Sequence, residues 1–379
     1  KKFFYKLDKT VKIIDIPIVL LAFTKNQKDV LTELLYIRND CMIVGNSQFG
    51  DFKLPTYKAY FYSLPFFKKV FNIYKNSSGY KRLSFKYVFH EYWFMYGYFK
   101  MIVGVFRDSK TKIVVLSNDT TLRTRIMAYV CKHLRIKSIY IQHASISSNY
   151  PNLIFDYALL DGRDALNKYI QIGNIQSEVF LVGNLKLPSV FNENTRVLNI
   201  GICFGLIDDL KKVEYLIIQV LNSFDPENIL LRAHPREERI YFLRDIKRRY
   251  GINISDSKKV LSYEFLKKVD CIIASESNIH LEAVSANIVT IFYCLTNDDD
   301  NIFDVYGFIK NKLVFYNCKE LIKLDIVLND IKQNKPNVRN RAKYYYDTIG
   351  TIFDGKTSVL YNEIINYIKS GQASFINNN

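Results

Sequence analysis

Short apolar runs rich in β-branched residues alternate with helix-like segments along most of this chain. One example is the run 271–274, which is followed by the helical pattern 279–286 and then by the apolar run 288–292. Runs of this length are typical of strands buried on both faces, and parallel strands need a crossover helix to return to the same edge of a sheet. The alternation therefore predicts an α/β protein built on parallel sheets.

The alternation occurs in two blocks, 11–182 and 197–292. The stretch between them, 187–195, contains Pro188 and several asparagines and is typical of a linker. A chain of 379 residues also exceeds the usual size of a single core. We therefore predict a first domain, a second domain, and a C-terminal helix with a tail. Their predicted boundaries are 1–187, 196–350 and 351–379.

The segment 52–106 departs from this alternation, because tyrosine, phenylalanine and lysine crowd it. Two arrangements fit such a composition. One is a helical hairpin whose aromatic side packs into a core. The other is a layer on a membrane surface, with rings at headgroup depth and lysines on anionic lipid. We prefer the packed hairpin, because an aromatic stripe at helical spacing usually belongs to a core.

The net charge of +16 indicates an anionic partner, since 53 basic residues face 37 acidic ones. Nucleotide phosphates, an anionic membrane, an acidic polymer and nucleic acid all fit that charge. We expect no nucleic acid, because the sequence carries no RNA-binding or helix-turn-helix signature. The hydrophobic content of 49% excludes a disordered chain.

The six cysteines occur singly and show neither a disulfide framework nor zinc-ligand spacing. A reducing cytoplasm is the simplest setting for such a chain. The apolar run 16–23 is too short to span a bilayer. We therefore expect a cytoplasmic protein.

Two stretches in the second block carry phosphate-binding chemistry. The first contains Arg232, His234 and Pro235 directly after an apolar run, and Pro235 suits the first position of a helix. The second, after the run 271–274, contains a small polar cluster that opens a helix. Helix starts offer free N–H groups to phosphates. The alternative for each is an ordinary capped turn with a solvated charged face. The polar residues of the second stretch are Ser275, Ser277, Asn278 and Glu282.

Polar residues also follow predicted strands in the first block. Asn118 and Asp119 follow the run 112–116, whereas His143 and Ser145 follow the run 138–142. Asp161 follows the run 155–160. The carboxyl ends of parallel strands share one edge of a sheet, where open α/β sheets bind ligands.

The chain resembles GT-B glycosyltransferases that use CMP-activated sugars, on the doubled α/β layout, the His234-Pro235 turn and the Ser275/Ser277 turn. These are the bacterial sialyltransferases, polysialyltransferases and Kdo transferases. The resemblance assigns phosphate and ribose binding to those four residues. That family's acidic motif is incomplete here, because Leu160 precedes Asp161-Gly162.

The chain is also similar to the CDP-glycerol glycerophosphotransferases. Their histidine at a strand end matches His143, and their Arg-x-His-Pro turn matches 232–235. Ala144 stands where that family prefers glycine. Members of both families release CMP, which makes a cytidine donor the shared expectation.

The resemblance implies two Rossmann-like domains facing each other across a cleft, with the C-terminal helices packing back on the first domain. It implies an inverting transfer, without a metal, from a CMP-sugar (sialic acid, another nonulosonate, or Kdo) to a surface glycan of capsule or lipopolysaccharide. The acceptor would be anionic or lipid-linked, and the enzyme would lie at the inner face of the cytoplasmic membrane. The acidic run 297–300 is expected to be a solvated loop, not a metal site.

Roles follow for the individual residues. His234 and Arg232 would stabilise the departing phosphate. His143 and Asp161 are the two candidates for the general base, and histidine has an ordinary pKa near working pH. Donor contacts are expected from Pro235, Ser275, Ser277, Asn278 and Glu282, and acceptor contacts from Asn118, Asp119 and Ser145. The alternatives are a CDP-glycerol-type polyol-phosphate transferase, a UDP-sugar transferase or epimerase, and a non-catalytic nucleic-acid or membrane-binding module.

Overall fold

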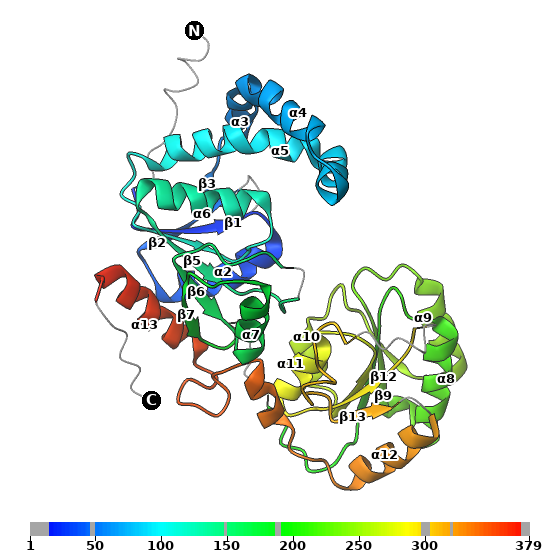
Figure 1. The fold of residues 1–379 in the computed structure, drawn as a ribbon. Helices are drawn as coiled ribbons and strands as arrows, with labels where there is room; N and C mark the ends of the chain where they lie inside the picture. The colour runs from blue at the N-terminus through cyan, green and yellow to red at the C-terminus, as the bar shows by residue number, and fades with distance from the viewer. Residues whose placement is uncertain are drawn as a thin grey trace. The chain divides into compact units, whose positions relative to one another are not determined.

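The structure is a computed structural model that describes residues 15–45, 50–147, 150–185, 191–296, 304–318 and 321–372. It divides into two compact units (Figure 1). Unit 1 comprises Lys1–Leu185 and Lys356–Asn379, and unit 2 comprises Lys186–Gly355. Each unit contains one sheet of parallel strands, so the predicted α/β fold class is confirmed. The predicted linker residues 187–190 lie outside the described residues.

The sheet of unit 1 has seven strands in the order β3-β2-β1-β4-β5-β6-β7. The direction in which strands are added reverses between β1 and β4. These two strands are adjacent in the sheet although the helical segment 56–106 lies between them in the sequence. Such a reversal is the switch point at which open sheets bind ligands. The strands are β1 (Ile18–Ala22), β2 (Cys41–Gly45), β3 (Phe52–Lys53), β4 (Ile113–Leu116), β5 (Lys137–Ile141), β6 (Tyr157–Leu160) and β7 (Glu178–Leu181).

The helix α13 (Thr357–Ser370), the last one in the described ranges, packs on unit 1. Arg38, which follows α2 (Lys25–Ile37), donates hydrogen bonds to the side chains of Asn362 and Asn366. Lys369 forms an ion pair with Asp40 at 2.6 Å. The C-terminal helix therefore packs back on the first domain, as the resemblance implied. The helix α6 (Leu122–Leu134) connects β4 to β5, and α7 (Arg163–Ile172) connects β6 to β7.

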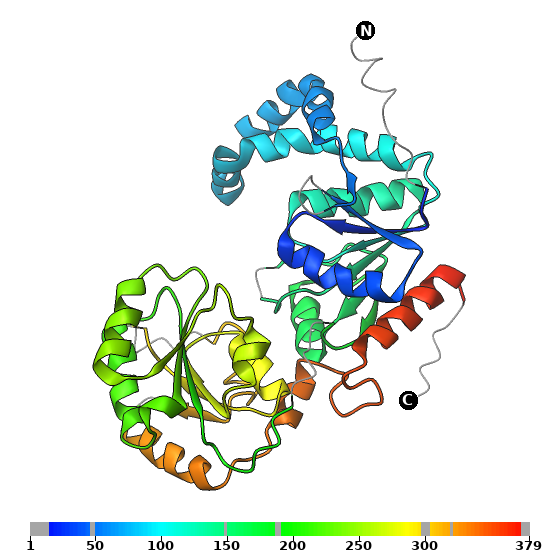
Figure 2. The same ribbon diagram turned by 180° about the vertical axis from the view of Figure 1, so that it is seen from behind.

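A helical layer covers α6, and the two views show α3 and α4 on the outer side of α5 (Figures 1 and 2). Its elements are α3 (Thr56–Ser63), the short helix η1 (Leu64–Phe66), α4 (Phe67–Lys75) and α5 (Gly79–Phe106). The predicted helical hairpin is thus confirmed. Its aromatic side is buried along the second half of α5, where Phe94, Tyr98 and Phe106 join the core. Burial was the wrong expectation for α3, whose aromatic side is exposed.

Close contact between α3 and α5 decides which face of α3 points outward. Gly97 N–H donates to Ser63 Oγ at 2.9 Å, and Ser63 Oγ donates to the carbonyl of Phe94 at 3.1 Å. Trp93 Nε1 donates to the carbonyl of Ser63 at 2.7 Å. The small face of α3, with Ala59 and Ser63 fully buried, therefore lies against α5.

The sheet of unit 2 has six parallel strands in the order β10-β9-β8-β11-β12-β13, with its switch point between β8 and β11. The strands are β8 (Ile200–Phe204), β9 (Ile229–Ala233), β10 (Asn253–Ser255), β11 (Cys271–Ala274), β12 (Val289–Tyr293) and β13 (Tyr316–Cys318). The α-helices are α8 (Leu210–Leu221), α9 (Ile240–Tyr250), α10 (Ser262–Leu266), α11 (Ile279–Ser285) and α12 (Leu321–Gln333), with short helices η2 (Pro226–Asn228) and η3 (Arg339–Tyr344).

None of the helices in the described ranges has the length and hydropathy of a segment that crosses a bilayer.

We predict that Gly97→Ala destabilises unit 1 by about 2 kcal/mol, because an added methyl group would overpack the α3 contact. A Cβ there would lie 1.8 Å from the carbonyl oxygen of Ala59 and 2.6 Å from Ser63 N. Thermal unfolding measures the effect. Gly104→Ala on the same helix is the matched control, since a Cβ there meets no atom within 4 Å. That variant should gain about 0.5–1 kcal/mol. Equal effects of the two substitutions would contradict the packing described.

Candidate functional site

A pocket of about 350 Å³ in unit 2 contains all seven residues predicted to bind the donor. It opens beyond the carboxyl ends of β9, β8 and β11, which are neighbours in the sheet at its switch point. The seven are Arg232, His234, Pro235, Ser275, Ser277, Asn278 and Glu282. Lining residues that the sequence analysis did not select include Phe204, Gly205, Asp208, Glu276 and Tyr306.

His234 lies exposed at this pocket, and its surroundings define its hydrogen-bonding role. Its backbone N–H donates to the carbonyl of Phe204 at 2.9 Å, which continues the β8–β9 pairing beyond the strand ends. Its Nδ1 accepts a hydrogen bond from the N–H of Arg236 at 3.1 Å. A neutral imidazole that accepts at Nδ1 carries its proton at Nε2. His234 therefore offers Nε2–H as a donor.

The turn after His234 corrects one expectation from the sequence. Pro235 does not begin a helix, because α9 starts at Ile240 and the intervening residues form a loop. The N–H of Glu237 donates to the carbonyl of His234 at 2.8 Å, which closes a β-turn. The side chain of Glu237 then accepts from the N–H of Arg239 at 2.9 Å. In a helix that began at Pro235, this N–H would instead donate to the carbonyl group four residues earlier.

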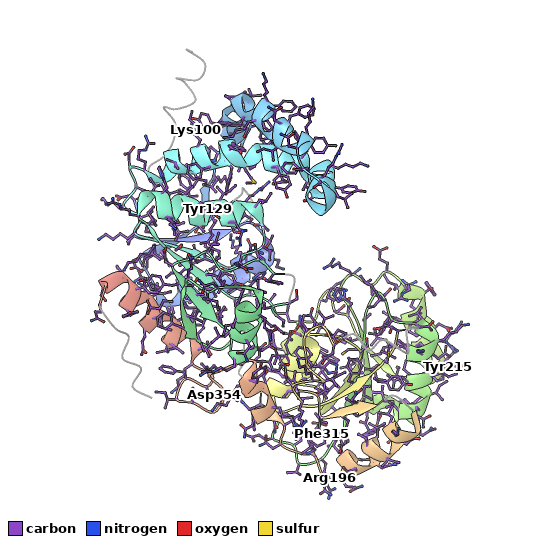
Figure 3. The ribbon with its side chains drawn as sticks, viewed as in Figure 1. Lys100, Tyr129, Arg196, Tyr215, Phe315 and Asp354 are labelled. Atoms are coloured by element: carbon purple, nitrogen blue, oxygen red, sulfur yellow. The ribbon has the colours of Figure 1, made fainter. Side chains whose placement is uncertain are left out.

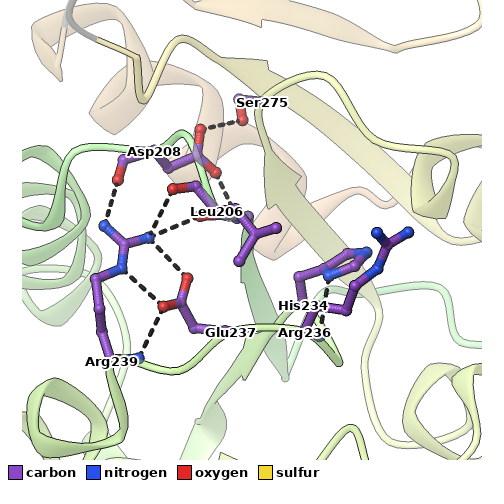
Figure 4. Close-up of polar contacts among 8 residues, drawn as sticks. Leu206, Asp208, His234, Arg236, Glu237, Arg239 and Ser275 are labelled. Carbon is purple, nitrogen blue, oxygen red and sulfur yellow. Dashed lines mark hydrogen bonds and ion pairs between the residues drawn. The ribbon is translucent and has the colours of Figure 1, made fainter. Parts of the chain in front are cut away.

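The guanidinium of Arg239 joins this loop to the loop that follows β8 (Figure 4). Nε and Nη2 donate to the two carboxylate oxygens of Glu237, both at 2.7 Å. Nη1 donates to the carbonyl of Asp208, and Nη2 also donates to those of Gly205 and Leu206, at 3.0 to 3.2 Å. A planar donor fork suits such a set of acceptors. The two loops are therefore held as one wall of the pocket.

Asp208 connects that wall to the end of β11 (Figure 4). Its carboxylate accepts from Gly205 N–H at 2.6 Å and from Ser275 Oγ at 2.7 Å. The side chain is buried, and this burial raises the pKa of Asp208 although both hydrogen bonds favour the carboxylate. Sequence reasoning missed Asp208. The available signal was its place in a short turn between a buried strand and a helix.

Ser275 is also fixed through its backbone. The fully buried His280 donates from Nε2 to the carbonyl of Ser275 at 2.9 Å, since a carbonyl can only accept. Burial lowers the pKa of His280 to about 4, so the ring is neutral near pH 7. His280 is the second residue of α11 and was not selected from the sequence, because its role depends on a tertiary contact.

Arg232 lies deeper in the pocket wall and is 9% exposed. Its guanidinium donates to Ser255 Oγ and to the carbonyl of Val260, both at 2.9 Å. It also lies 5.1 Å from the centre of the Phe265 ring and interacts electrostatically with Glu282. Arg232 is therefore held by the protein, and its charge acts on the pocket from a fixed position.

The remaining donor residues surround the start of α11. Ser277 Oγ accepts from the N–H of Ile279 at 3.4 Å, and Asn278 is the N-cap residue. Glu276 accepts from the N–H of Tyr306 at 3.1 Å, which brings that tyrosine to the pocket. The polar turn predicted after β11 thus faces the same cavity as the His234 turn.

The residues predicted in unit 1 follow three adjacent strands, β4, β5 and β6. Asn118 Oδ1 accepts from the N–H groups of Thr120 and Thr121 and from Thr124 Oγ1, so it holds the turn before α6, whose N-cap residue is Thr121. Asp119 is completely buried and accepts from Tyr169 Oη at 2.5 Å. In this structure the carboxylate of Asp119 does not reach solvent, and an acceptor contact by Asp119 stays a prediction.

His143 and Asp161 lie beyond the carboxyl ends of the neighbouring strands β5 and β6. Gln142 joins the two strand ends, because its Oε1 accepts from the N–H of Asp161 at 2.9 Å. His143 and Ser145 are half-buried. Asp161 is buried, which raises its pKa well above the usual range, and Asn184 donates to it at 3.3 Å.

Within the described ranges, no group of three or more His, Cys, Asp or Glu side chains is arranged to hold a metal ion. The acidic run 297–300 lies outside those ranges.

No family model and no curated protein sequence matches the chain. Solved structures do resemble it. The UDP-GlcNAc 2-epimerase of Neisseria meningitidis bound to UDP-GlcNAc matches with a TM-score of 0.62 and 11% identity, over 93% of this chain and 100% of that one. The UDP-GlcNAc 2-epimerase of Methanocaldococcus jannaschii gives 0.59 and 16%, over 93% and 100%.

A variant of the wall teichoic acid polymerase TagF soaked with CDPG matches with a TM-score of 0.52 and 15% identity, over 98% of this chain and 93% of that one. At these identities the likeness concerns the fold. It confirms the expected GT-B class with two Rossmann-like domains.

We predict that Arg239→Gln destabilises unit 2 by about 2–3 kcal/mol, because Glu237, whose side chain is 2% exposed, loses its charged partner. Thermal unfolding measures the loss. Arg248→Gln is the matched control, since its ion pair with Asp245 is at the surface. That variant should change stability by less than about 0.5 kcal/mol. The double variant Glu237→Gln/Arg239→Gln should lose less free energy of unfolding than Arg239→Gln alone, because it leaves no buried charge without a partner. A loss equal to the sum of the two single losses would contradict the pairing of Glu237 with Arg239.

A pH dependence follows from His280. Above pH 6.5 its imidazole is neutral in both the folded and the unfolded chain. As the pH falls from 6.5 towards 4, the unfolded chain takes up a proton that the buried ring refuses, so stability is lost. This difference corresponds to about 3 kcal/mol. His280→Gln keeps an amide donor and does not titrate.

The free energy of unfolding, measured from pH 7 to pH 4, should therefore fall more steeply for the wild type than for His280→Gln. The carboxylates of raised pKa titrate in both proteins, so their contributions cancel in the comparison. Parallel curves would contradict the buried neutral ring.

Proposed function

We propose that the chain is a GT-B transferase that binds a nucleotide-activated donor in the unit 2 pocket and passes the activated group to an acceptor hydroxyl. One observation carries the proposal. Residues of two separate loops, selected for phosphate and ribose binding, line one cavity of about 350 Å³ at the carboxyl ends of β9 and β11. Open α/β sheets bind ligands at that edge.

The pocket supplies groups for each part of a nucleotide. The Nε2–H of His234 and the fixed charge of Arg232 suit a phosphate. Glu282 suits the hydroxyl groups of a ribose. The rings of Phe204 and Tyr306, which also line the cavity, offer faces to a nucleobase. Asp208 and His280 act through Ser275, whose hydroxyl and carbonyl they hold.

The structural comparisons favour a UDP-sugar or a CDP-polyol as the donor, because the matched proteins were solved with UDP-GlcNAc and CDPG. A CMP-sugar carrying sialic acid, another nonulosonate or Kdo is supported by the His234-Pro235 and Ser275/Ser277 turns. All these donors share a phosphate that must gain negative charge when the transferred group departs. The pocket is proposed to stabilise that phosphate.

In sugar transfer, the acceptor oxygen forms a bond to the anomeric carbon and gives its proton to a base. The bond from that carbon to the donor phosphate breaks, and the nucleotide leaves with the electron pair. In polyol-phosphate transfer the acceptor oxygen attacks the terminal phosphorus instead, and CMP leaves. Fixed donors in a pocket stabilise such a leaving group because they need little reorganisation. The proposal includes no metal ion.

We propose that unit 1 supplies the base, from His143 or Asp161. The raised pKa of Asp161 brings a carboxylate closer to working pH, where a general base is most effective. Its Oδ1 is buried and has no hydrogen-bond partner among the described residues. A buried orphan oxygen of this kind is a feature of functional sites.

The acceptor is proposed to be an anionic or lipid-linked glycan of the cell surface, handled at the inner face of the cytoplasmic membrane. The net charge of +16 supports an anionic acceptor.

We predict that His234→Asn lowers the transfer rate by about 100-fold or more. Asparagine places its amide near the position of Nδ1, so Arg236 keeps its acceptor, but the donor at Nε2 is lost. His234→Gln reaches the position of Nε2 and should retain more activity. Nucleotide release from UDP-GlcNAc, CDP-glycerol, CMP-sialic acid and CMP-Kdo, with and without glycan acceptors, measures the effect in EDTA.

His133→Asn on α6 is the matched control, since His133 is exposed in unit 1. His143→Gln and Asp161→Asn should lose transfer but keep nucleotide affinity. Full activity of His234→Asn with every donor would overturn the assignment. Turnover of UDP-GlcNAc without an acceptor would identify an epimerase instead.

A further inference from the structure

The segment 56–106 carries much of the positive charge of the chain. It contains seven lysines and one arginine against one glutamate, a net charge of +7 out of +16. The single acid, Glu91, lies 3.7 Å from the guanidinium of Arg123. The helical layer formed by this segment is therefore strongly cationic.

The helix α3 presents its apolar side to solvent. Tyr57, Tyr60, Phe61 and Leu64 are 50%, 48%, 37% and 54% exposed. Their spacing of three, one and three residues places them on one face of a helix. An ordinary surface helix buries such a stripe. Here the contact of Ser63 with Gly97 occupies the opposite face, so the stripe cannot turn inward.

The apolar stripe continues along α4 with cations beside it. Phe67 and Phe71 are 49% and 38% exposed and stack with their ring centres 6.2 Å apart. Lys75 Nζ lies 4.9 Å from the centre of the Phe71 ring. The first turns of α5 repeat the pattern, because Leu83 and Tyr87 are 50% and 72% exposed. Arg82 and Lys86 precede these two residues and are exposed as well.

A hollow lined by residues of η1 and α4 and of the turn after α4 adds a place for a phosphate. It has a volume of about 600 Å³, and Lys68 and Lys69 line it together with polar groups. Lys69 Nζ lies 5.7 Å from the centre of the Tyr96 ring. The other lining residues are Pro65, Asn72, Ile73, Asn76 and Ser77.

We propose that this outer face of α3, α4 and the start of α5 docks on a bilayer of anionic phospholipid. Exposed rings at headgroup depth and lysines beside them are the two groups that such a surface binds. Lys68 and Lys69 would take a lipid phosphate in the hollow. A second copy of the chain fits poorly, because two such cationic faces repel each other. The proposal does not rest on transferase activity.

The experiment is flotation of the full chain with vesicles of phosphatidylcholine alone or with about one third phosphatidylglycerol, at about 0.1 M salt. We expect binding to the anionic vesicles only. Lys68→Gln/Lys69→Gln should weaken that binding by about tenfold or more, since each basic residue near such a surface contributes about fivefold. Tyr57→Ser/Leu64→Ser should weaken it by about tenfold.

Matched controls come from unit 2, where exposed side chains of the same kinds occur. Lys267→Gln/Lys268→Gln removes an exposed lysine pair, and Tyr215→Ser/Ile218→Ser removes side chains of α8 that are 62% and 40% exposed. Tyr215 is labelled in Figure 3. Both controls should bind as the wild type does. The melting temperature checks the fold of every variant.

Equal binding to the two kinds of vesicle, or equal losses in the unit 1 and unit 2 variants, would overturn the proposal. Retention on nucleic acid at about 0.2 M salt, with no binding to anionic vesicles, would also overturn it. Because vesicle binding is measured without donor or acceptor, its failure would leave the transfer proposal intact.

Discussion

One guanidinium joins the two loops on which the pocket of unit 2 depends. Arg239 contacts Glu237 in the loop after β9 and three carbonyl groups in the loop after β8. The second loop carries Asp208, which in turn holds the hydroxyl group of Ser275. Burying these charged groups costs desolvation energy, and the cost is offset only because nearly every donor has an acceptor. The arrangement fixes the two loops and the end of β11 before any ligand arrives, which lowers the cost of binding.

The architecture was predictable because strand-like and helix-like segments alternate in both units outside the segment 52–106. The pocket was partly predictable, since the His234 and Ser275 turns both follow buried strands. The first residue of α9 was not predictable from the sequence. Pro235 satisfies a local rule for a first helical residue, but the tertiary bonds of Arg239 and Glu237 hold the chain in a loop for several further residues. His280 was not predictable for the same reason, because only its tertiary contact with Ser275 gives it a role, whereas the position of Asp208 in a turn after a buried strand was a signal in the sequence.

The aromatic segment 52–106 shows that composition alone does not predict which side of a helix is buried. The same tyrosines, phenylalanines and lysines fit both a packed hairpin and a membrane surface. The two arrangements differ in whether the aromatic face of a helix points into the core or towards solvent. Small residues settle that direction, since Ala59 and Ser63 meet Gly97 and leave the rings outside. Asp119 shows the converse case. A polar residue beyond a strand end was expected to meet a ligand, but Tyr169 encloses it within the domain.

The chain leaves unit 1 near residue 185 and returns to it at 356, where α13 follows. Unit 2 is therefore an insertion, tethered by two covalent crossings instead of one. During synthesis α13 leaves the ribosome only after all of unit 2, so Arg38 and Asp40 wait for their partners until then. A chain cut before α13 would leave Arg38 paired with Asp40 alone, and the flank of unit 1 that α13 covers would be exposed. The contacts that complete unit 1 therefore join residues more than 320 positions apart in the sequence, on either side of the whole of unit 2.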